Sequence, residues 1–239
     1  MKSAKMTNQN SKMPDRQRIH DAEQIYQRLV RIALQETLKP NPQLKNPALD
    51  LNVRVWRQAV LCRVKELGGA VLDLHRQGRH VTAAILARSL LETVALYYHI
   101  FIVLKEAIDT GNTRQAVDKL WQAGMGLHGG RKEGDKEGGT LKQYDAIEVK
   151  EFAKEFCALA GPARWSYDQL SEIVHPNCMG CVFAYAQPDR QNLSYRFGKD
   201  FRHIEINYDY VLEFALGFLE LHYAEMDKLI NEFMKLMQE

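Results

Sequence analysis

The most apolar segment of the chain carries two opposite charges. Arg88 and Glu92 stand four residues apart, so in a helix they share one face and can touch. His99 follows eleven residues after Arg88, three helical turns along the same stripe. Because burying an unpaired charge is costly, we expect the pair to contact each other or groups on another helix. The pair is then either an ion pair that fixes helix register or the floor of a polar pocket.

A second polar stripe lies in the segment 163–175. Ser171 and His175 are four residues apart, and Arg164 precedes His175 by eleven, so all three line one side of a helix. At a helix C-terminus the dipole favours a protonated histidine. An imidazole acid or base near a cation suits phosphodiester or acyl chemistry, whereas the structural alternative is a histidine that caps its own helix. We predict that this stripe converges with Arg88 and Glu92, which makes these five residues the candidate catalytic group.

A cysteine pair follows the second stripe. Cys178 and Cys181 have the Cys-x-x-Cys spacing of a metal knuckle, with His175 as a third ligand. A closed zinc site would need a fourth ligand from Cys157 or His203, because the chain has no second Cys-x-x-Cys pair. A redox role needs a cysteine at a helix N-terminus, and this pair leads into a predicted strand. We therefore predict structural thiols, no metal and no cofactor, with a site at His175, Cys178 and Cys181 as the alternative.

The elements that position these groups are predicted to be mainly helical. Apolar residues recur at spacings of three and four, the pattern of amphipathic helices. Two runs rich in Val, Phe, Tyr and Leu flank a polar turn at 187–192, and they predict a β-hairpin at about 179–198. The fold class is therefore mostly α, a multi-helix bundle with a small β-hairpin appended near the C-terminal third. The predicted helices span 15–38, 52–76, 80–109, 113–124, 144–160, 163–175 and 208–237, and the predicted strands span 179–186 and 193–198.

Local signals set the predicted ends of these elements. Pro40 stops the first helix, and Asn52 is a suitable N-cap for the second. Gly68 and Gly69 fall inside that second helix, where they are tolerable if another helix packs closely and otherwise mark a kink. Gly111 closes the apolar core helix.

The chain is predicted to form one helical domain over 15–239. Residues 1–14 read as a disordered basic lead, with a nucleic-acid arm as the alternative, and 124–139 as a mobile glycine-rich loop. The net charge of +2 gives no general reason to expect a nucleic-acid or membrane partner. The apolar stretch 90–104 is shorter than the ~20 residues of a membrane span, so we expect a buried helix. Four cysteines without an export signal indicate a cytoplasmic protein.

The two polar stripes together resemble a known group of proteins. The segment from Arg88 to Glu92, followed some eighty residues later by the segment from Ser171 to His175, is similar to uncharacterised bacterial helical proteins, several of them HEPN-like. The resemblance covers about 80–185. It implies a bundle whose Arg, Glu, Ser and His converge on one site. HEPN proteins include metal-independent ribonucleases and toxins of bacterial defence, and their Arg and His stand closer together than Arg164 and His175 do here.

Two functions follow as hypotheses. The first is a binding or interaction module, with a polar pocket between the core helix and the Ser171–His175 helix. The second, implied by the resemblance, is a HEPN-like ribonuclease, with His175 as general acid or base and Arg164 or Arg88 stabilising the phosphorane charge. RNA is the candidate partner of the second. We expect a homo-oligomer in both cases, because the bundle has several long amphipathic helices.

Overall fold

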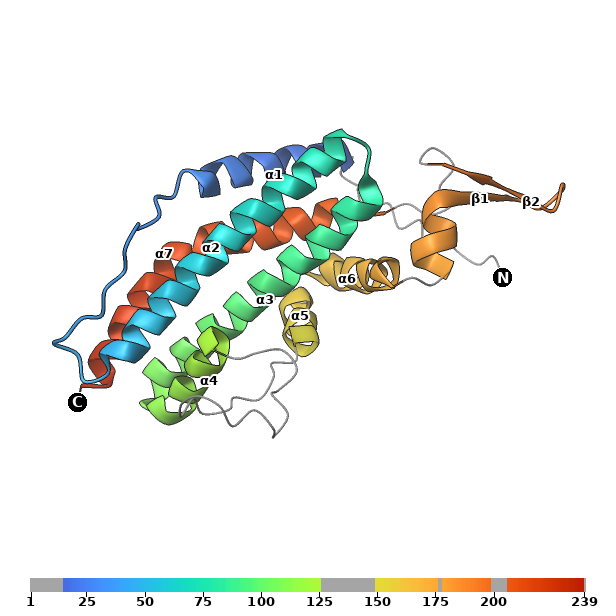
Figure 1. The fold of residues 1–239 in the computed structure, drawn as a ribbon. Helices are drawn as coiled ribbons and strands as arrows, with labels where there is room; N and C mark the ends of the chain where they lie inside the picture. The colour runs from blue at the N-terminus through green and yellow to red at the C-terminus, as the bar shows by residue number, and fades with distance from the viewer. Residues whose placement is uncertain (1–14, 126–148, 176–177, 199–205, 239) are drawn as a thin grey trace, which may run out of the picture.

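The computed structural model describes residues 15–125, 149–175, 178–198 and 206–238. Within these ranges the chain forms seven α-helices, a short π-helix and one two-stranded antiparallel hairpin (Figure 1). The predicted fold class is confirmed. The elements are α1 (Asp15–Val30), α2 (Pro47–Arg76), α3 (His80–Thr110), α4 (Thr113–Met125), α5 (Val149–Ala158), α6 (Gly161–Val174), η1 (Cys178–Phe183), β1 (Ala186–Asp189), β2 (Ser194–Phe197) and α7 (Asp209–Leu236).

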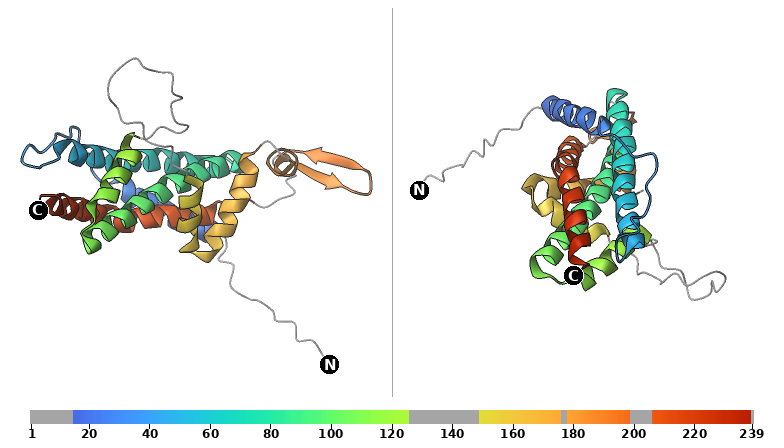
Figure 2. Two further views of the ribbon diagram at one scale, coloured as in Figure 1. Left: turned by 90° about the horizontal axis from the view of Figure 1, so that it is seen from below. Right: turned by 90° about the vertical axis from the view of Figure 1, so that its left-hand side faces the viewer.

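The long apolar helix α3 lies at the centre of the bundle. It packs against α2, α4, α5, α6 and α7, while α1 lies across α2 and α7 (Figures 1 and 2). Its side chains Leu90, Leu91 and Leu104 are fully buried, and burying a leucine contributes about 1.5–3 kcal/mol. By length and composition α3 is also the one described helix that could cross a membrane, a feature that it shares with the core helices of helical bundles.

The ends of the first two helices differ from the prediction. Helix α1 ends at Val30 rather than near 38, because Lys65 donates to the carbonyl oxygens of Val30 and Ile32 at 3.2 and 2.8 Å. Gln58 and Gln35 then exchange two hydrogen bonds that hold the following segment against α2. Side chains of α2 thus satisfy the backbone groups that a longer helix would have paired internally.

Helix α2 begins at Pro47, not at 52, and its N-cap is Asn46 rather than Asn52. The Asn46 side chain accepts a hydrogen bond from the Leu49 amide at 3.1 Å. Proline at the first helical position is favourable because its missing N–H would have no partner there. The capping chemistry was visible in the sequence, and the prediction chose the wrong asparagine.

The glycine pair in α2 accommodates a close neighbour. A Cβ atom on Gly69 would lie 2.6 Å from the hydroxyl oxygen of Tyr26, and one on Gly68 would lie 3.1 Å from the Tyr26 ring. Helix α2 runs through both positions without a break. The glycines therefore let α1 approach α2 closely, which confirms the packing alternative over a kink.

The first strand of the hairpin lies later in the chain than predicted, whereas the second falls within its predicted range of 193–198. Residues 178–183 form η1 instead of a strand, and β1 pairs with β2 from Ala186 opposite Phe197 to Asp189 opposite Ser194. A Cβ atom at Gly180 would lie 2.1 Å from the His175 carbonyl oxygen, so the chain folds back on the end of α6 before it can extend. Short apolar runs do not distinguish a helical turn from a strand.

Several predictions fall wholly or partly outside the described residues. These are the basic lead at 1–14, the glycine-rich loop at 124–139 except its first two positions, and the start of the predicted helix at 144–160. The first two loop positions, 124 and 125, belong to α4. The predicted bounds of α3, α4 and α7 otherwise agree with the structure to within one or two residues.

Candidate functional site

The predicted charge pair on α3 meets a tyrosine of α6. Arg88 Nη2 lies 3.0 Å from Glu92 Oε1, and the two side chains are 20% and 27% exposed. Tyr167 donates its hydroxyl to the same carboxylate oxygen at 3.1 Å, and the guanidinium lies 5.8 Å from the centre of the Tyr167 ring. Arg88, Glu92 and Tyr167 are called the Arg88 cluster below. The pairing of Arg88 with Glu92 is thus as predicted, and Tyr167 joins it to the predicted second helix.

Burial fixes the protonation of the tyrosine in this cluster. Desolvation raises the pKa of the Tyr167 hydroxyl, and the Glu92 charge raises it further. The phenol therefore keeps its proton at neutral pH and acts as a hydrogen-bond donor. Glu92 Oε1 forms an ion pair with the guanidinium and accepts the hydrogen bond of the phenol. The cluster as a whole carries no net charge, because it holds one cation, one anion and a neutral phenol.

Arg88 has a buried donor without an acceptor. Its Nε atom is inaccessible to solvent and has no hydrogen-bond partner among the described residues. A buried polar group left unpaired costs about 1–3 kcal/mol, and native proteins contain few of them. The one other buried side-chain nitrogen or oxygen in this state, within the described ranges, is His99 Nε2. Arg88 and His99 both belong to the polar stripe of α3 that their spacing in the sequence predicts.

His99 occupies a separate position on that stripe. Its ring stacks on Phe152 of α5, with centroids 3.8 Å apart and planes inclined by 17°. Burial, with a smaller contribution from the Lys119 charge on α4, lowers the pKa of His99 to about 4. The imidazole is therefore neutral near pH 7. Eleven residues along a helix correspond to about 16 Å, so His99 lies too far from Arg88 to share one small ligand.

The residues of the second stripe that were predicted to be catalytic do not share the contacts of Tyr167. Ser171 donates its hydroxyl to the Tyr167 carbonyl oxygen of its own helix at 2.9 Å. His175 is exposed in the C-cap position of α6, and Arg164 is exposed near its start. Among the described residues, no hydrogen bond or ion pair joins these three to Arg88 or Glu92. Their catalytic roles stay predictions.

Tyr167 was absent from the predicted group, although a signal for it existed. It precedes Ser171 by four residues and therefore shares its face of α6. Serine and histidine were predicted instead because these residue types are the commoner catalytic groups. The contact that forms uses the Tyr167 hydroxyl, while the Ser171 hydroxyl donates to a carbonyl oxygen of its own helix.

The structure describes only part of the cysteine segment, so the role of Cys178 and Cys181 stays a prediction. Cys181 is exposed in η1, and the Cys178 side chain lies outside the described residues. Cys157 is buried, and burial together with the Asp168 charge raises the pKa of its thiol to about 12. Within the described ranges no group of three or more His, Cys, Asp or Glu side chains is placed to hold a metal ion.

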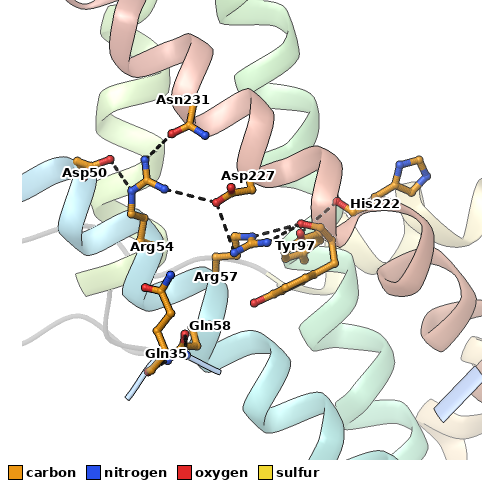
Figure 3. Close-up of polar contacts among 10 residues, drawn as sticks. Gln35, Asp50, Arg54, Arg57, Gln58, Tyr97, His222, Asp227 and Asn231 are labelled. Carbon is orange, nitrogen blue, oxygen red and sulfur yellow. Dashed lines mark hydrogen bonds and ion pairs between the residues drawn. The ribbon is translucent and has the colours of Figure 1, made fainter. Parts of the chain in front are cut away.

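A second arginine network joins α2 to α7 (Figure 3). Arg54 donates from Nε to Asp50 at 2.8 Å and from Nη2 to Asn231 at 2.7 Å, and its Nη1 lies 3.4 Å from Asp227. We call Asp50, Arg54, Arg57, Asp227 and Asn231, with the Tyr223 groups that Arg57 contacts, the α2–α7 network. Every nitrogen of the Arg54 guanidinium has an acceptor.

Arg57 is equally well satisfied within the α2–α7 network. Its Nη2 and Nε donate to the Tyr223 carbonyl oxygen at 2.9 and 3.3 Å, and its Nη1 lies 3.5 Å from Asp227. The guanidinium also lies 3.8 Å from the centre of the Tyr223 ring, a distance suited to a cation–π interaction. The α2–α7 network was not among the predicted sites, although Asp50 and Arg54 have the four-residue spacing of a helical ion pair.

Comparison of the chain with protein-family models, with curated proteins and with solved structures finds no match.

Proposed function

We propose that the protein is a cytoplasmic binding module and that the Arg88 cluster, between α3 and α6, is its ligand site. The observation that carries the proposal is the buried Arg88 Nε, which has a hydrogen to donate and no described acceptor. The atom is closed to solvent in this structure, so a ligand oxygen reaches it only if the Arg88 side chain, which is 20% exposed, turns outward; the new hydrogen bond would then recover the cost of the unpaired donor.

The charge balance of the cluster selects the kind of ligand. Glu92 already neutralises Arg88 at 3.0 Å, so the site does not call for a strongly anionic group such as a phosphate. Both described contacts of the Glu92 carboxylate fall on Oε1, and Oε2 can accept a hydrogen bond from a ligand. A donor on Arg88 and an acceptor on Glu92 together suit an amide, which carries a carbonyl oxygen beside an N–H group.

Thermal unfolding of the full chain with small probes tests this function. Nicotinamide and uracil present the amide pattern, and inorganic phosphate is the anionic comparison. At ten times its Kd a ligand stabilises the folded state by about 1.4 kcal/mol, which corresponds to a rise of roughly 3–6 °C in a chain of this size. We expect that rise with an amide probe and not with phosphate.

Two variants test whether the rise in Tm depends on the Arg88 cluster. Arg88→Lys keeps a cation near Glu92 but removes the Nε donor, so it abolishes the rise. Arg54→Lys, in the α2–α7 network, lowers the starting Tm and leaves the rise intact. If no probe raises the Tm, or if Arg88→Lys responds as the wild type does, the proposal is wrong.

Cleavage of RNA is the second candidate function, and the exposure of Arg164 and His175 on α6 favours it because a polymer could reach both. The two residues are about 16 Å apart along the helix, so one chain cannot place both at a single phosphate, and a second copy would have to contribute. Structured and single-stranded RNA are incubated with the protein in EDTA. Cleavage that is lost in His175→Ala supports this function, and intact RNA eliminates it.

A further inference from the structure

Two histidine rings at one end of the bundle meet at the same tyrosine hydroxyl. His75 Nδ1 lies 2.7 Å from the Tyr208 hydroxyl oxygen, and His80 Nδ1 lies 2.8 Å from it. The three residues, called the His–Tyr–His cluster below, come from the last turn of α2, the first position of α3 and the N-cap of α7. Figure 1 shows the α2–α3 turn at the end of these long helices. Two imidazole nitrogens therefore converge on one oxygen atom.

The turn between α2 and α3 fixes the separation of the two histidines. The Arg79 amide donates to the Leu74 carbonyl oxygen, and the Gly78 amide donates to the His75 carbonyl oxygen, both at 2.9 Å. These two bonds, with Gly78 in the left-handed region at a φ of 71°, form a Schellman motif. The motif holds the backbone on which both rings are mounted, and the ring centroids lie 5.3 Å apart.

The phenol oxygen of the cluster is its most buried part. Tyr208 is 2% exposed, whereas His75 and His80 are both partly exposed. A small ion can therefore reach the cluster from the side of the imidazole rings. An entry path of this kind is one of the requirements of a metal site.

The atoms of the cluster are also donor atoms for a metal. A neutral phenol has one hydrogen, so it donates to one imidazole and accepts a hydrogen bond from the other. Once the phenol loses its proton, both Nδ1 atoms can direct a lone pair toward a cation that the phenolate oxygen also binds. Imidazole nitrogens are common ligands of zinc, copper, iron and nickel. The cluster therefore offers two nitrogen ligands and one anionic oxygen ligand.

We propose that His75, His80 and Tyr208 form a binding site for a copper(II) ion. With metal–ligand bonds of about 2.0–2.1 Å, donor atoms at right angles lie about 2.9 Å apart, and donor atoms at tetrahedral angles lie about 3.3 Å apart. The nitrogen–oxygen distances of 2.7 and 2.8 Å are closer to the first value. Tetragonal sites with nitrogen and oxygen ligands favour Cu(II) or Ni(II), and copper binds more tightly than nickel or zinc.

Binding changes the protons of the cluster. The phenol proton is released to the solvent, and the imidazole that donated from Nδ1 carries its hydrogen on Nε2 instead. Tyr208 is 133 and 128 positions away from the two histidines, so spacing in the sequence gave no indication of this site. The inference does not rest on the proposed ligand site, because the Arg88 cluster shares no residue with the His–Tyr–His cluster.

Titration of the full chain with Cu(II) chloride tests the proposal. We expect the first equivalent to produce a visible absorption band, from charge transfer between the Tyr208 phenolate and copper, and a tetragonal electron paramagnetic resonance spectrum. Copper held by histidines alone lacks the phenolate band, so the band reports this site. An equal concentration of Zn(II) should leave the band in place, because zinc binds such ligands more weakly than copper.

Three variants assign the band to the cluster. Tyr208→Phe keeps the ring and removes the ligand oxygen, so the band disappears. His75→Gln and His80→Gln each remove one nitrogen ligand and weaken copper binding at least about tenfold, because even the loss of an outer-shell partner costs that much. The matched control His222→Gln changes another partly exposed histidine, which bonds Glu225, and should bind copper as the wild type does.

Two sets of results would overturn the proposal. The first is a wild type that shows no phenolate band at one equivalent of copper. The second is a band that persists in Tyr208→Phe, or one that is weakened as much by His222→Gln as by His80→Gln. Circular dichroism establishes that each variant is folded, and the two histidine variants carry the test if Tyr208→Phe does not fold. Failure of the amide probes at the Arg88 cluster would leave the copper band unchanged, so the two proposals fail separately.

Discussion

Two helical arginine–carboxylate pairs in this protein have the same four-residue spacing and different surroundings. In the α2–α7 network, Arg54 bonds Asp50 and then finds Asp227 and Asn231 on the facing helix. In the Arg88 cluster, Arg88 bonds Glu92, the facing helix presents Tyr167, and Arg88 Nε stays without a partner among the described residues. Arg54, whose three nitrogens all have acceptors, joins two helices, whereas the unpaired Nε of Arg88 is the basis of the proposed ligand site.

The largest effect is expected in the α2–α7 network, from the loss of Arg57. Arg57→Ala removes two hydrogen bonds to the Tyr223 carbonyl oxygen, the contact with Asp227 and the stacking on the Tyr223 ring. We expect the free energy of unfolding to fall by about 2–3 kcal/mol. Urea unfolding followed by circular dichroism measures it. A loss below about 0.5 kcal/mol, the scale of an ordinary surface substitution, would show that the network is not structural.

The other buried unpaired nitrogen, His99 Nε2, predicts a pH effect. The folded-state pKa of His99 is about 4, below the usual 6.5, so the unfolded chain binds the proton more readily. Stability is therefore lost as the pH falls from 6.5 toward 4. His99→Phe keeps the ring stacking on Phe152 and removes the titrating group.

Unfolding midpoints at pH 7 and pH 5 measure the contribution of His99. His75, whose pKa is lowered by burial and by Arg76, contributes in the same direction and remains in the variant. His99→Phe should therefore lose less stability than the wild type between the two pH values. An equal loss in both proteins would exclude His99 as the source.

A smaller effect is expected at the α6 side of the Arg88 cluster. Tyr167→Phe removes the hydroxyl that donates to Glu92 at 3.1 Å, and a hydrogen bond of this kind contributes about 1 kcal/mol. Tyr195→Phe on the exposed hairpin is the matched control and should leave the stability of the bundle unchanged. Equal unfolding midpoints for Tyr167→Phe and the wild type would remove Tyr167 from the cluster.

The smallest effect is expected for the charge pair itself. The double variant Arg88→Met/Glu92→Gln loses the ion pair but also removes the unpaired Nε, so the two changes partly cancel. We expect a cost below about 1 kcal/mol, less than that of Arg57→Ala. If this double variant loses more unfolding free energy than Arg57→Ala does, then Arg88 contributes more to stability than the α2–α7 network, which contradicts the distinction drawn between the two arginines.

Local pattern allowed much of the fold to be predicted. The periodicity of α3 and α7 gave their bounds closely, and the spacing of Arg88 and Glu92 gave their contact. The α2–α7 network was missed because Arg54 and Asp227 are 173 positions apart, and spacing carries no information on such pairs. The early end of α1 was missed for the same reason, because Lys65 of α2 caps it.

The candidate site was predicted in part. The sequence indicated that α3 and the later polar helix would meet near Arg88, and Tyr167 makes that contact. Which polar residue of α6 reaches α3 depends on the rotation of α6 about its own axis, which the packing of its buried residues Ala163 and Leu170 sets. The sequence does not determine that rotation, because several polar side chains share one face of α6.

The most direct test of the central claim is the Nε–H signal of Arg88 in a ¹H–¹⁵N spectrum of the full chain, assigned by its absence in Arg88→Lys. The claim predicts that titration with nicotinamide or uracil moves this signal, while the Nε–H signals of Arg54 and Arg57 stay in place. An Arg88 signal that none of the probes moves would contradict the assignment of the Arg88 cluster as a ligand site.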